Sequence, residues 1–160
     1  MAGVDTSVQH TQQPATNVHG LNGGGHPHRG ATAPRRKIIA RVQELIPDMQ
    51  ASGGGALICT GNTSAYRGKP RFAGVAPTKA AQRILLESIA REAGPHGIHA
   101  AYVAIDAVID LEWTRKFFAD KPDEFFCQPS DIAEEVFRMA HQPRSAWSFE
   151  SVIRPFGEVW

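Results

Sequence analysis

The sequence predicts an incomplete α/β domain, in which a partial parallel sheet is covered by crossover helices. Apolar residues at three- and four-residue steps, which indicate amphipathic helices, alternate along the chain with short apolar runs, which indicate strands. The run at 98–105, IHAAYVAI, is mostly apolar rather than strictly alternating. This pattern is typical of a strand covered on both faces, as in parallel sheets with crossover helices. We therefore expect βαβ units between about residues 35 and 160.

Length and composition allow one globular domain. The chain has 160 residues, of which 42% are hydrophobic and 21% charged, with a formal net charge of +1. This near-neutral balance favours neither a nucleic-acid partner nor an anionic membrane. No apolar run reaches the length of a membrane-spanning helix or of a secretory signal core, so we expect a cytoplasmic protein. With Cys59 and Cys127 as the only cysteines, a disulfide framework is not supported.

Residues 1–34 form a leader with a different composition. It lacks sustained apolar periodicity and is rich in Gly, Pro, Thr and Gln, which predicts disorder. Its glycine cluster at 20–25 lacks the preceding strand and following helix of a phosphate-binding loop. No metal site is expected, because four histidines lack zinc-site spacing: His10, His19, His26 and His28. Either this leader is genuine, or it is misjoined sequence that replaces an ordinary first half.

The first predicted elements are a helix, a strand and a second helix. Apolar residues from Ile38 to Met49 lie on one helix face; Pro47 should bend the last turn, and Gly53–Gly55 should end it. The apolar run 56–60 predicts a strand that opens onto Gly61. A longer helix is expected at 77–93, with Gly94 and Pro95 as its stop signal.

Beyond the strand at 98–105, three further elements are expected. A short helix covers 112–119 and is broken by Pro122. Ser130 or Asp131 can cap the next helix, with Glu134 in the position of a capping box. A last strand is plausible at about 149–153.

These elements carry a family resemblance. The segment 53–106 reads GGGALICTGNTSAYRGKPRFAGVAPTKAAQRILLESIAREAGPHGIHAAYVAID, and PSDIAEEVFRMAHQPRSAW follows at 129–147. Together they resemble the later half of a short-chain dehydrogenase/reductase, with the N-terminal βαβ half missing. The resemblance runs from about Lys37 to the end, roughly three quarters of the chain. It implies a Rossmann-like parallel sheet that binds NAD or NADP at the carboxyl ends of its strands.

The resemblance also implies site residues. The family uses a tyrosine hydroxyl for acid–base chemistry, with a lysine four residues later that shares the helix face and favours the phenolate. Lys79 matches this lysine, but Val75 occupies the tyrosine position and has no exchangeable proton. The family's serine position falls on Asn62. Because Pro77 suits a first helical residue, we expect the helix to begin there and Val75 to lie in the preceding loop. The expected cofactor contacts are Gly61, Lys79, Ile105 and Asp106.

Several of these assignments have alternatives. Lys79 either binds the nicotinamide ribose or is a solvated lysine in the first helical turn. Asp106 and Asp110 either contact cofactor or substrate, or cap a loop. A set of aromatic residues either lines a substrate pocket or packs in the core: Trp113, Phe117, Phe118, Phe125 and Phe126.

The sequence supports two functions of different classes. The first is an NAD(P)-dependent oxidoreductase of a carbonyl or alcohol substrate, with weak or no activity in this chain because the tyrosine and the Gly-rich turn are missing. The second is a non-catalytic fragment that pairs with itself or with a full-length relative through the helices at 37–49 and 77–93. Without the first strands, the strand at 56–60 would keep an unpaired edge.

Overall fold

The computed structural model describes residues 42 and 44–157. The leader at 1–34, with its predicted disorder, its glycine cluster and four histidines, therefore lies outside the described residues. Residues 44–51 are helical, and Pro47 lies within this segment. Gly53 and Gly54 follow with φ angles of 87° and 115°, in the left-handed region that favours glycine. The predicted glycine stop of this helix is confirmed.

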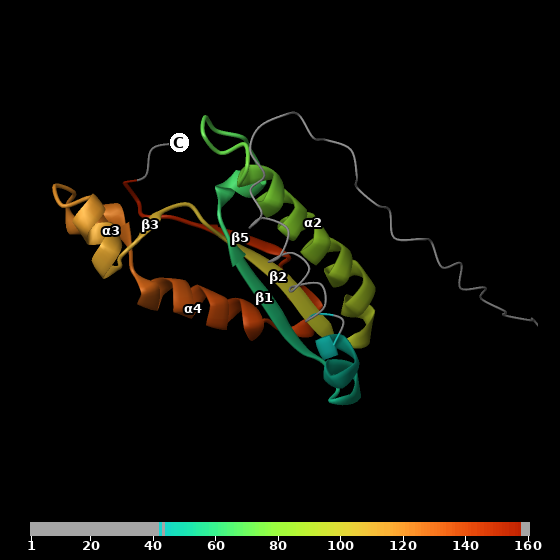
Figure 1. The fold of residues 1–160 in the computed structure, drawn as a ribbon. Helices are drawn as coiled ribbons and strands as arrows, with labels where there is room; N and C mark the ends of the chain where they lie inside the picture. Colours follow the sequence, from blue (N-terminus) through green and yellow to red (C-terminus); the bar gives the residue numbers. More distant parts are fainter. Residues whose placement is uncertain (1–41, 43, 158–160) are drawn as a thin grey trace, which may run out of the picture.

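A parallel sheet forms the centre of the molecule (Figure 1). Its strands are β1 (Gly55–Gly61), β2 (Ile98–Ile105) and β5 (Glu150–Ile153), in the order β1-β2-β5. Both pairings are parallel, with Gly61 opposite Ala104 and Ile153 opposite Ile105. A second, two-stranded parallel sheet joins β3 (Val108–Ile109) to β4 (Phe126–Cys127), which the sequence patterns did not predict. The predicted α/β class with a parallel sheet is confirmed.

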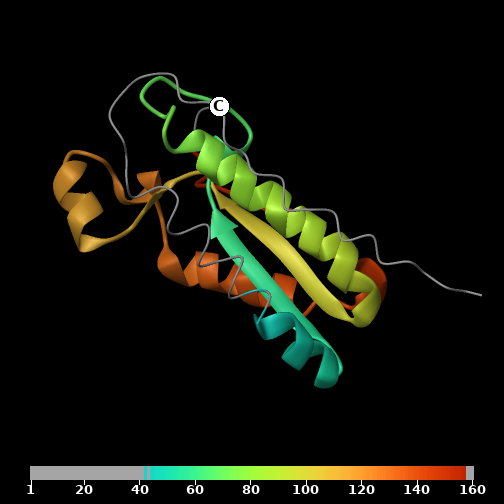
Figure 2. The ribbon, with the colours of Figure 1, turned by 45° about the vertical axis from the view of Figure 1, so that its right-hand side comes forward.

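Helices cover the two faces of the sheet (Figures 1 and 2). The long helix α2 (Ala76–Ala93) lies on one face and α4 (Pro129–Ala140) on the other, while the short α3 (Glu112–Phe117) lies beyond the end of the sheet. Every residue of β2 is buried. Its residues alternate between two hydrophobic clusters. Tyr102 belongs to the cluster that contains residues of α2, and Val103 belongs to the cluster that contains residues of α4. The predicted strand with two covered faces is therefore confirmed.

Three helix boundaries differ from the predictions. Helix α2 begins at Ala76 rather than Pro77, because the Ala76 N–H already donates to the Phe72 carbonyl at 2.8 Å. Helix α4 begins at Pro129, whose missing N–H costs nothing at a first helical position, so the predicted capping box at Asp131 does not form. Helix α3 ends at Phe117, before Pro122 is reached. Among the described residues, no helix is long and apolar enough to cross a membrane.

Candidate functional site

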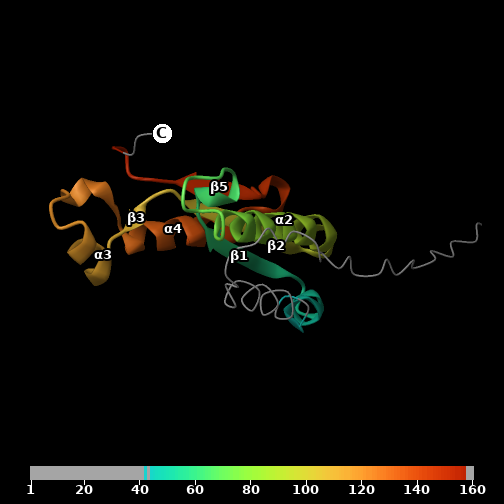
Figure 3. The same ribbon diagram turned by 45° about the horizontal axis from the view of Figure 1, so that its top comes forward.

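The carboxyl ends of β1 and β2 bring four of the predicted site residues together. Gly61 and Ile105 are the last residues of their strands, and Asn62 and Asp106 follow them directly. The Asp106 N–H donates to the Ile153 carbonyl at 2.9 Å, which ties the end of β2 to the end of β5. In Figure 3 the loop after β1 and the segment that carries α3 lie beyond this same end of the sheet.

Asn62 stabilises the loop after β1 rather than lining an open site. It is the N-cap of the short 3-10 helix Thr63–Ala65, where its Oδ1 accepts a hydrogen bond from the Ser64 N–H at 3.1 Å. The amide oxygen of Asn62 therefore satisfies a backbone donor that the helix start would otherwise leave unpaired.

Asp106 joins the ends of two strands. One carboxylate oxygen accepts a hydrogen bond from the Thr63 hydroxyl, and the other lies 3.7 Å from the Arg67 guanidinium. The Asp106 side chain is only 12% exposed. This geometry favours the loop-cap interpretation of Asp106 over a cofactor contact. The Thr63 hydroxyl is the nearest hydroxyl in sequence to Asn62, the family's serine position. Its hydrogen bond to Asp106 already engages it.

Val75 and Lys79 lie one helical turn apart. Val75 is the N-cap of α2 with helical backbone angles, φ −97° and ψ −48°, and the residue is 46% exposed. Its carbonyl accepts the Lys79 N–H at 3.1 Å. Val75 therefore lies just before the first residue of α2, as predicted, but its backbone already has helical angles. The two residues keep the i, i+4 relationship that the chemistry of the family requires.

The Lys79 side chain is half-buried and faces β1. Its Nζ lies 3.4 Å from Oε1 of Gln82, whose Nε2 donates to the Cys59 sulfur at 2.8 Å. Burial raises the pKa of the Cys59 thiol, while Gln82 and the Lys79 charge oppose the increase. The ammonium group is therefore positioned by Gln82 near the end of β1, which argues against a purely solvated lysine.

Neither tyrosine replaces the missing phenol. The Tyr66 hydroxyl donates to Glu150, and burial together with this carboxylate raises the pKa of Tyr66. Tyr102 is fully buried, and its hydroxyl has no hydrogen-bond partner among the described residues. This hydroxyl lies so close to Gly61 that a Cβ atom there would be 1.7 Å away. The close approach explains a glycine at the end of β1.

A cluster missed by the sequence interpretation holds the loop after β1 onto β5. Arg83 donates to both carboxylate oxygens of Glu150, at 2.9 and 2.6 Å, and its guanidinium lies 5.4 Å from the Tyr66 ring. This pair lowers the pKa of Glu150. Tyr66 and Glu150 are far apart in sequence, and no local pattern connects them.

The remaining candidates have structural roles or are exposed. Asp110 accepts hydrogen bonds from Arg115 and Gln128, and these lower its pKa to about 2. The aromatic set divides: Phe126 is buried beneath Arg115, whereas Trp113 and Phe117 are 62% and 80% exposed. Neither a common substrate pocket nor a common core accounts for all five aromatic residues.

Of the predicted site side chains Lys79, Asn62 and Asp106, only Lys79 is placed to hold a nicotinamide cofactor. Its ammonium is held beside the end of β1, one turn after Val75, as the resemblance requires of a ribose ligand. The side-chain oxygens of Asn62 and Asp106 are already used within the protein. Among the described residues, no group of three or more His, Cys, Asp and Glu side chains is placed to hold a metal ion.

No protein-family model and no curated protein sequence matches the chain. Solved structures do. The chain is 33% identical to a short-chain dehydrogenase from Rhodopseudomonas palustris, over 68% of this chain and 42% of that one, with a TM-score of 0.52. It is 22% identical to an alcohol dehydrogenase from the archaeon Thermococcus sibiricus, complexed with 5-hydroxy-NADP, over 74% and 48% of the two chains, with a TM-score of 0.58.

A third similar structure is an NADPH-bound short-chain oxidoreductase from Pseudomonas aeruginosa PAO1, described as containing an atypical catalytic centre. It is 18% identical over 76% of this chain and 52% of that one, with a TM-score of 0.64. The chain thus spans about half the length of these proteins. The described residues have the fold of part of a short-chain dehydrogenase/reductase, with a partial Rossmann-like sheet.

Proposed function

We propose that this chain is the later half of an NAD(P)-dependent oxidoreductase of the short-chain dehydrogenase/reductase family, acting on a carbonyl or alcohol. The identity of 33% with the Rhodopseudomonas palustris enzyme and the position of Lys79 support this proposal. The expectation for the activity of this chain rests on Val75, which lies one helical turn before Lys79. We therefore propose that this chain alone has weak or no activity.

The physical reason is that Val75 cannot carry a proton, although it stands where Lys79 could assist an acid–base group. The Thr78 hydroxyl donates to the Val75 carbonyl at 2.7 Å, and the Thr63 hydroxyl donates to Asp106. A positioned acid–base group typically contributes about 10²- to 10⁴-fold to the rate. Bound NAD or NADP would supply the hydride, and Lys79 would hold its ribose.

Reduction of a panel of aldehydes and ketones, followed by the loss of NADPH absorbance, tests this proposal. We expect no turnover above that of buffer for the wild-type chain. Turnover that is abolished by Lys79→Ala but kept by Lys116→Ala would show that the chain is active and that the proposed inactivity is wrong. Lys116 suits this control because it is an exposed lysine whose ion pair with Glu112 lies on α3.

A second candidate function is that of an interaction fragment, and the edge of β1 favours it. Within the described residues, β1 pairs only with β2, and Gly55, Ala56 and Thr60 are exposed. The outer surface of α2 also carries Ile84, which is 56% exposed. An unpaired strand edge and an exposed apolar side chain on α2 both favour pairing with another copy or with a full-length relative.

Light scattering coupled to size exclusion checks this second candidate. A concentration-dependent dimer, or co-elution with a purified full-length relative, would support it, whereas a monomer at all concentrations would contradict self-pairing. We also propose a cytoplasmic location, the compartment in which the free thiols of Cys59 and Cys127 persist.

A further inference from the structure

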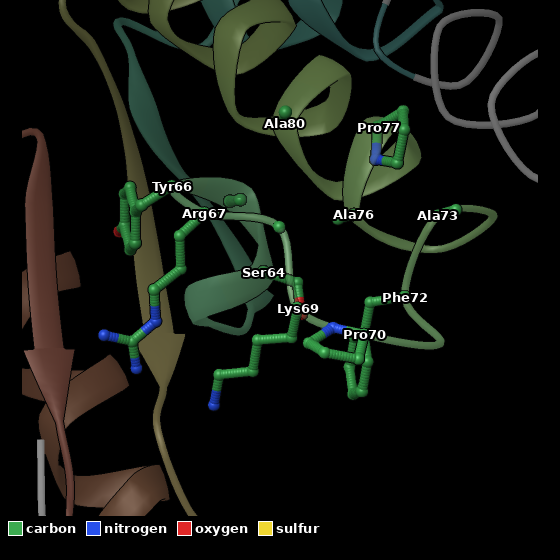
Figure 4. Close-up of a pocket in the computed structure, with 12 residues that line it drawn as sticks. Ser64, Tyr66, Arg67, Lys69, Pro70, Phe72, Ala73, Ala76, Pro77 and Ala80 are labelled. Carbon is green, nitrogen blue, oxygen red and sulfur yellow. The ribbon is translucent and has the colours of Figure 1, made fainter.

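A cleft of about 550 Å³ lies between the loop after β1 and the first turns of α2 (Figure 4). Its volume falls within the range of small-molecule sites. Much of its lining is apolar: Ala65, Pro70, Phe72, Ala73, Ala76, Pro77 and Ala80. None of Asn62, Val75 and Lys79 lines it, although the lining residues Ser64 and Arg67 contact Asn62 and Asp106 at the strand ends.

Two cations and no carboxylate line this cleft. Arg67 and Lys69 extend toward the same side in Figure 4. Arg67 is partly neutralised by Asp106 at 3.7 Å. The Lys69 side chain is exposed and makes no hydrogen bond or ion pair with the other described residues. Lys69 therefore supplies the main uncompensated charge of the cleft.

The Ser64 hydroxyl adds a second polar element. Ser64 is only 7% exposed and lines the cleft, and its backbone N–H is occupied by Asn62. Its hydroxyl makes no hydrogen bond to another described residue and, unlike the Tyr102 hydroxyl, is not a fully buried atom, so a ligand can reach it. A ligand oxygen in the cleft would give this hydroxyl a partner.

The helix start offers no additional donor. The N–H groups of Ala76, Thr78 and Lys79 already donate to the carbonyls of Phe72 and Val75, and Pro77 has no N–H. An anion in this cleft would thus depend on side chains rather than on the backbone of α2.

We propose that this cleft binds a small organic anion, with a carboxylate beside Lys69 and Arg67 and an aliphatic body against the alanine and proline lining. The combination of one uncompensated cation, an accessible hydroxyl and an apolar wall selects a monoanionic amphipathic molecule over a sugar or a polyphosphate. This binding is independent of the proposed oxidoreductase activity, because no residue of the Val75–Lys79 pair takes part.

Titration of the full chain with hexanoate, followed by backbone amide chemical shifts, tests the proposal. We expect shifts concentrated at residues 64–80, with hexanoate binding more tightly than hexanol, hexylammonium and acetate. Lys69→Met should weaken hexanoate binding by about fivefold, the equivalent of roughly 1 kcal/mol for an exposed charge-assisted contact. Lys116→Met, an exposed lysine on α3, should leave the affinity unchanged.

A second variant separates the apolar contribution from the charge. Ala80→Phe should block the cleft and abolish the shifts, while the remaining amide spectrum shows that the chain is folded. Equal binding of hexanoate and hexanol would overturn the role of Lys69. Equal binding of hexanoate and acetate would overturn the apolar wall, and shifts spread evenly over the surface would overturn the site.

Discussion

The backbone N–H of Lys79 donates to the carbonyl of Val75 at 3.1 Å, which places the two residues one turn apart at the start of α2. A lysine and a partner at this spacing can interact directly. In this chain the partner is an aliphatic side chain that can neither accept nor release a proton. The helix geometry of the proposed site is therefore present, while its acid–base group is not.

Gly61 and Tyr102 form the tightest contact of the candidate site. Gly61→Ala would place a Cβ atom 1.7 Å from the Tyr102 hydroxyl, so we expect a loss of about 3 kcal/mol in the free energy of unfolding. Urea denaturation followed by circular dichroism measures this loss. Gly68→Ala is the matched control, because no atom lies within 4 Å of its added Cβ, and it should be nearly neutral.

Tyr102→Phe should be neutral or slightly stabilising, because it removes a buried hydroxyl that lacks a hydrogen-bond partner among the described residues. Combined with Gly61→Ala, Tyr102→Phe should recover part of the lost stability because it removes the hydroxyl that the new Cβ meets. The recovery should be incomplete, since the Cζ atom of the ring would still lie 2.4 Å from the new Cβ. Strictly additive effects of the two substitutions in urea denaturation would contradict the proposed contact.

Glu150 should contribute stability that depends on pH. Its pKa is lowered, mainly by the hydrogen bonds from Arg83, so its contribution is present above the ordinary pKa of 4.5 and is lost as the pH falls through the lower folded value. Glu150→Gln should cost about 2 kcal/mol at pH 7, because the side chains of this pair are only 20% and 25% exposed. The difference from wild type should shrink as the pH approaches 3.

Urea denaturation from pH 3 to pH 7 checks this expectation. Glu112→Gln is a suitable control, since Glu112 and its partner Lys116 are 87% and 72% exposed and such pairs contribute little. A Glu150→Gln difference that stays constant across this pH range would contradict the ion-pair explanation.

Among the described residues the outer edge of β1 is unpaired, and this edge should promote self-association. Thr60→Lys places a charge on an exposed residue of this strand, which disfavours pairing with another strand. We expect less concentration-dependent light scattering from this variant than from wild type. Ala119→Lys adds the same charge in the exposed turn after α3, away from the edge, and should leave the scattering unchanged. An equal effect of both variants would indicate a general charge effect rather than edge pairing.

The fold could be predicted largely because its strongest patterns are local. The run at 98–105 indicated a strand with two covered faces, and Gly53 and Gly54 marked a helix end through their conformational freedom. The start of α2 was misplaced because a contact before it, from the Ala76 N–H to the Phe72 carbonyl, begins the helical turn one residue before Pro77. Hydrogen bonds of this kind leave no signature in residue type.

The candidate site was predicted only in part, for a similar reason. The resemblance to short-chain dehydrogenases/reductases implied Lys79, Asn62, Gly61, Ile105 and Asp106, and the structure places four of them at one end of the sheet. Sequence alone could not show that Thr63 and Arg67 contact Asp106. Nor could it show that Arg83 and Tyr66 both donate hydrogen bonds to Glu150, because these interactions depend on how distant segments pack.

The most direct test of the account is a spectrophotometric titration of Val75→Tyr, in which phenolate absorbance is followed between pH 7 and pH 12. Tyr66 and Tyr102 both have raised pKa values, so the introduced phenol should ionise first. We predict a pKa below the ordinary value of 10 for this phenol, because the Lys79 ammonium favours the phenolate. Adding Lys79→Met should raise it again. A phenol pKa of 10 or above that Lys79→Met leaves unchanged would contradict the proposed pairing of positions 75 and 79.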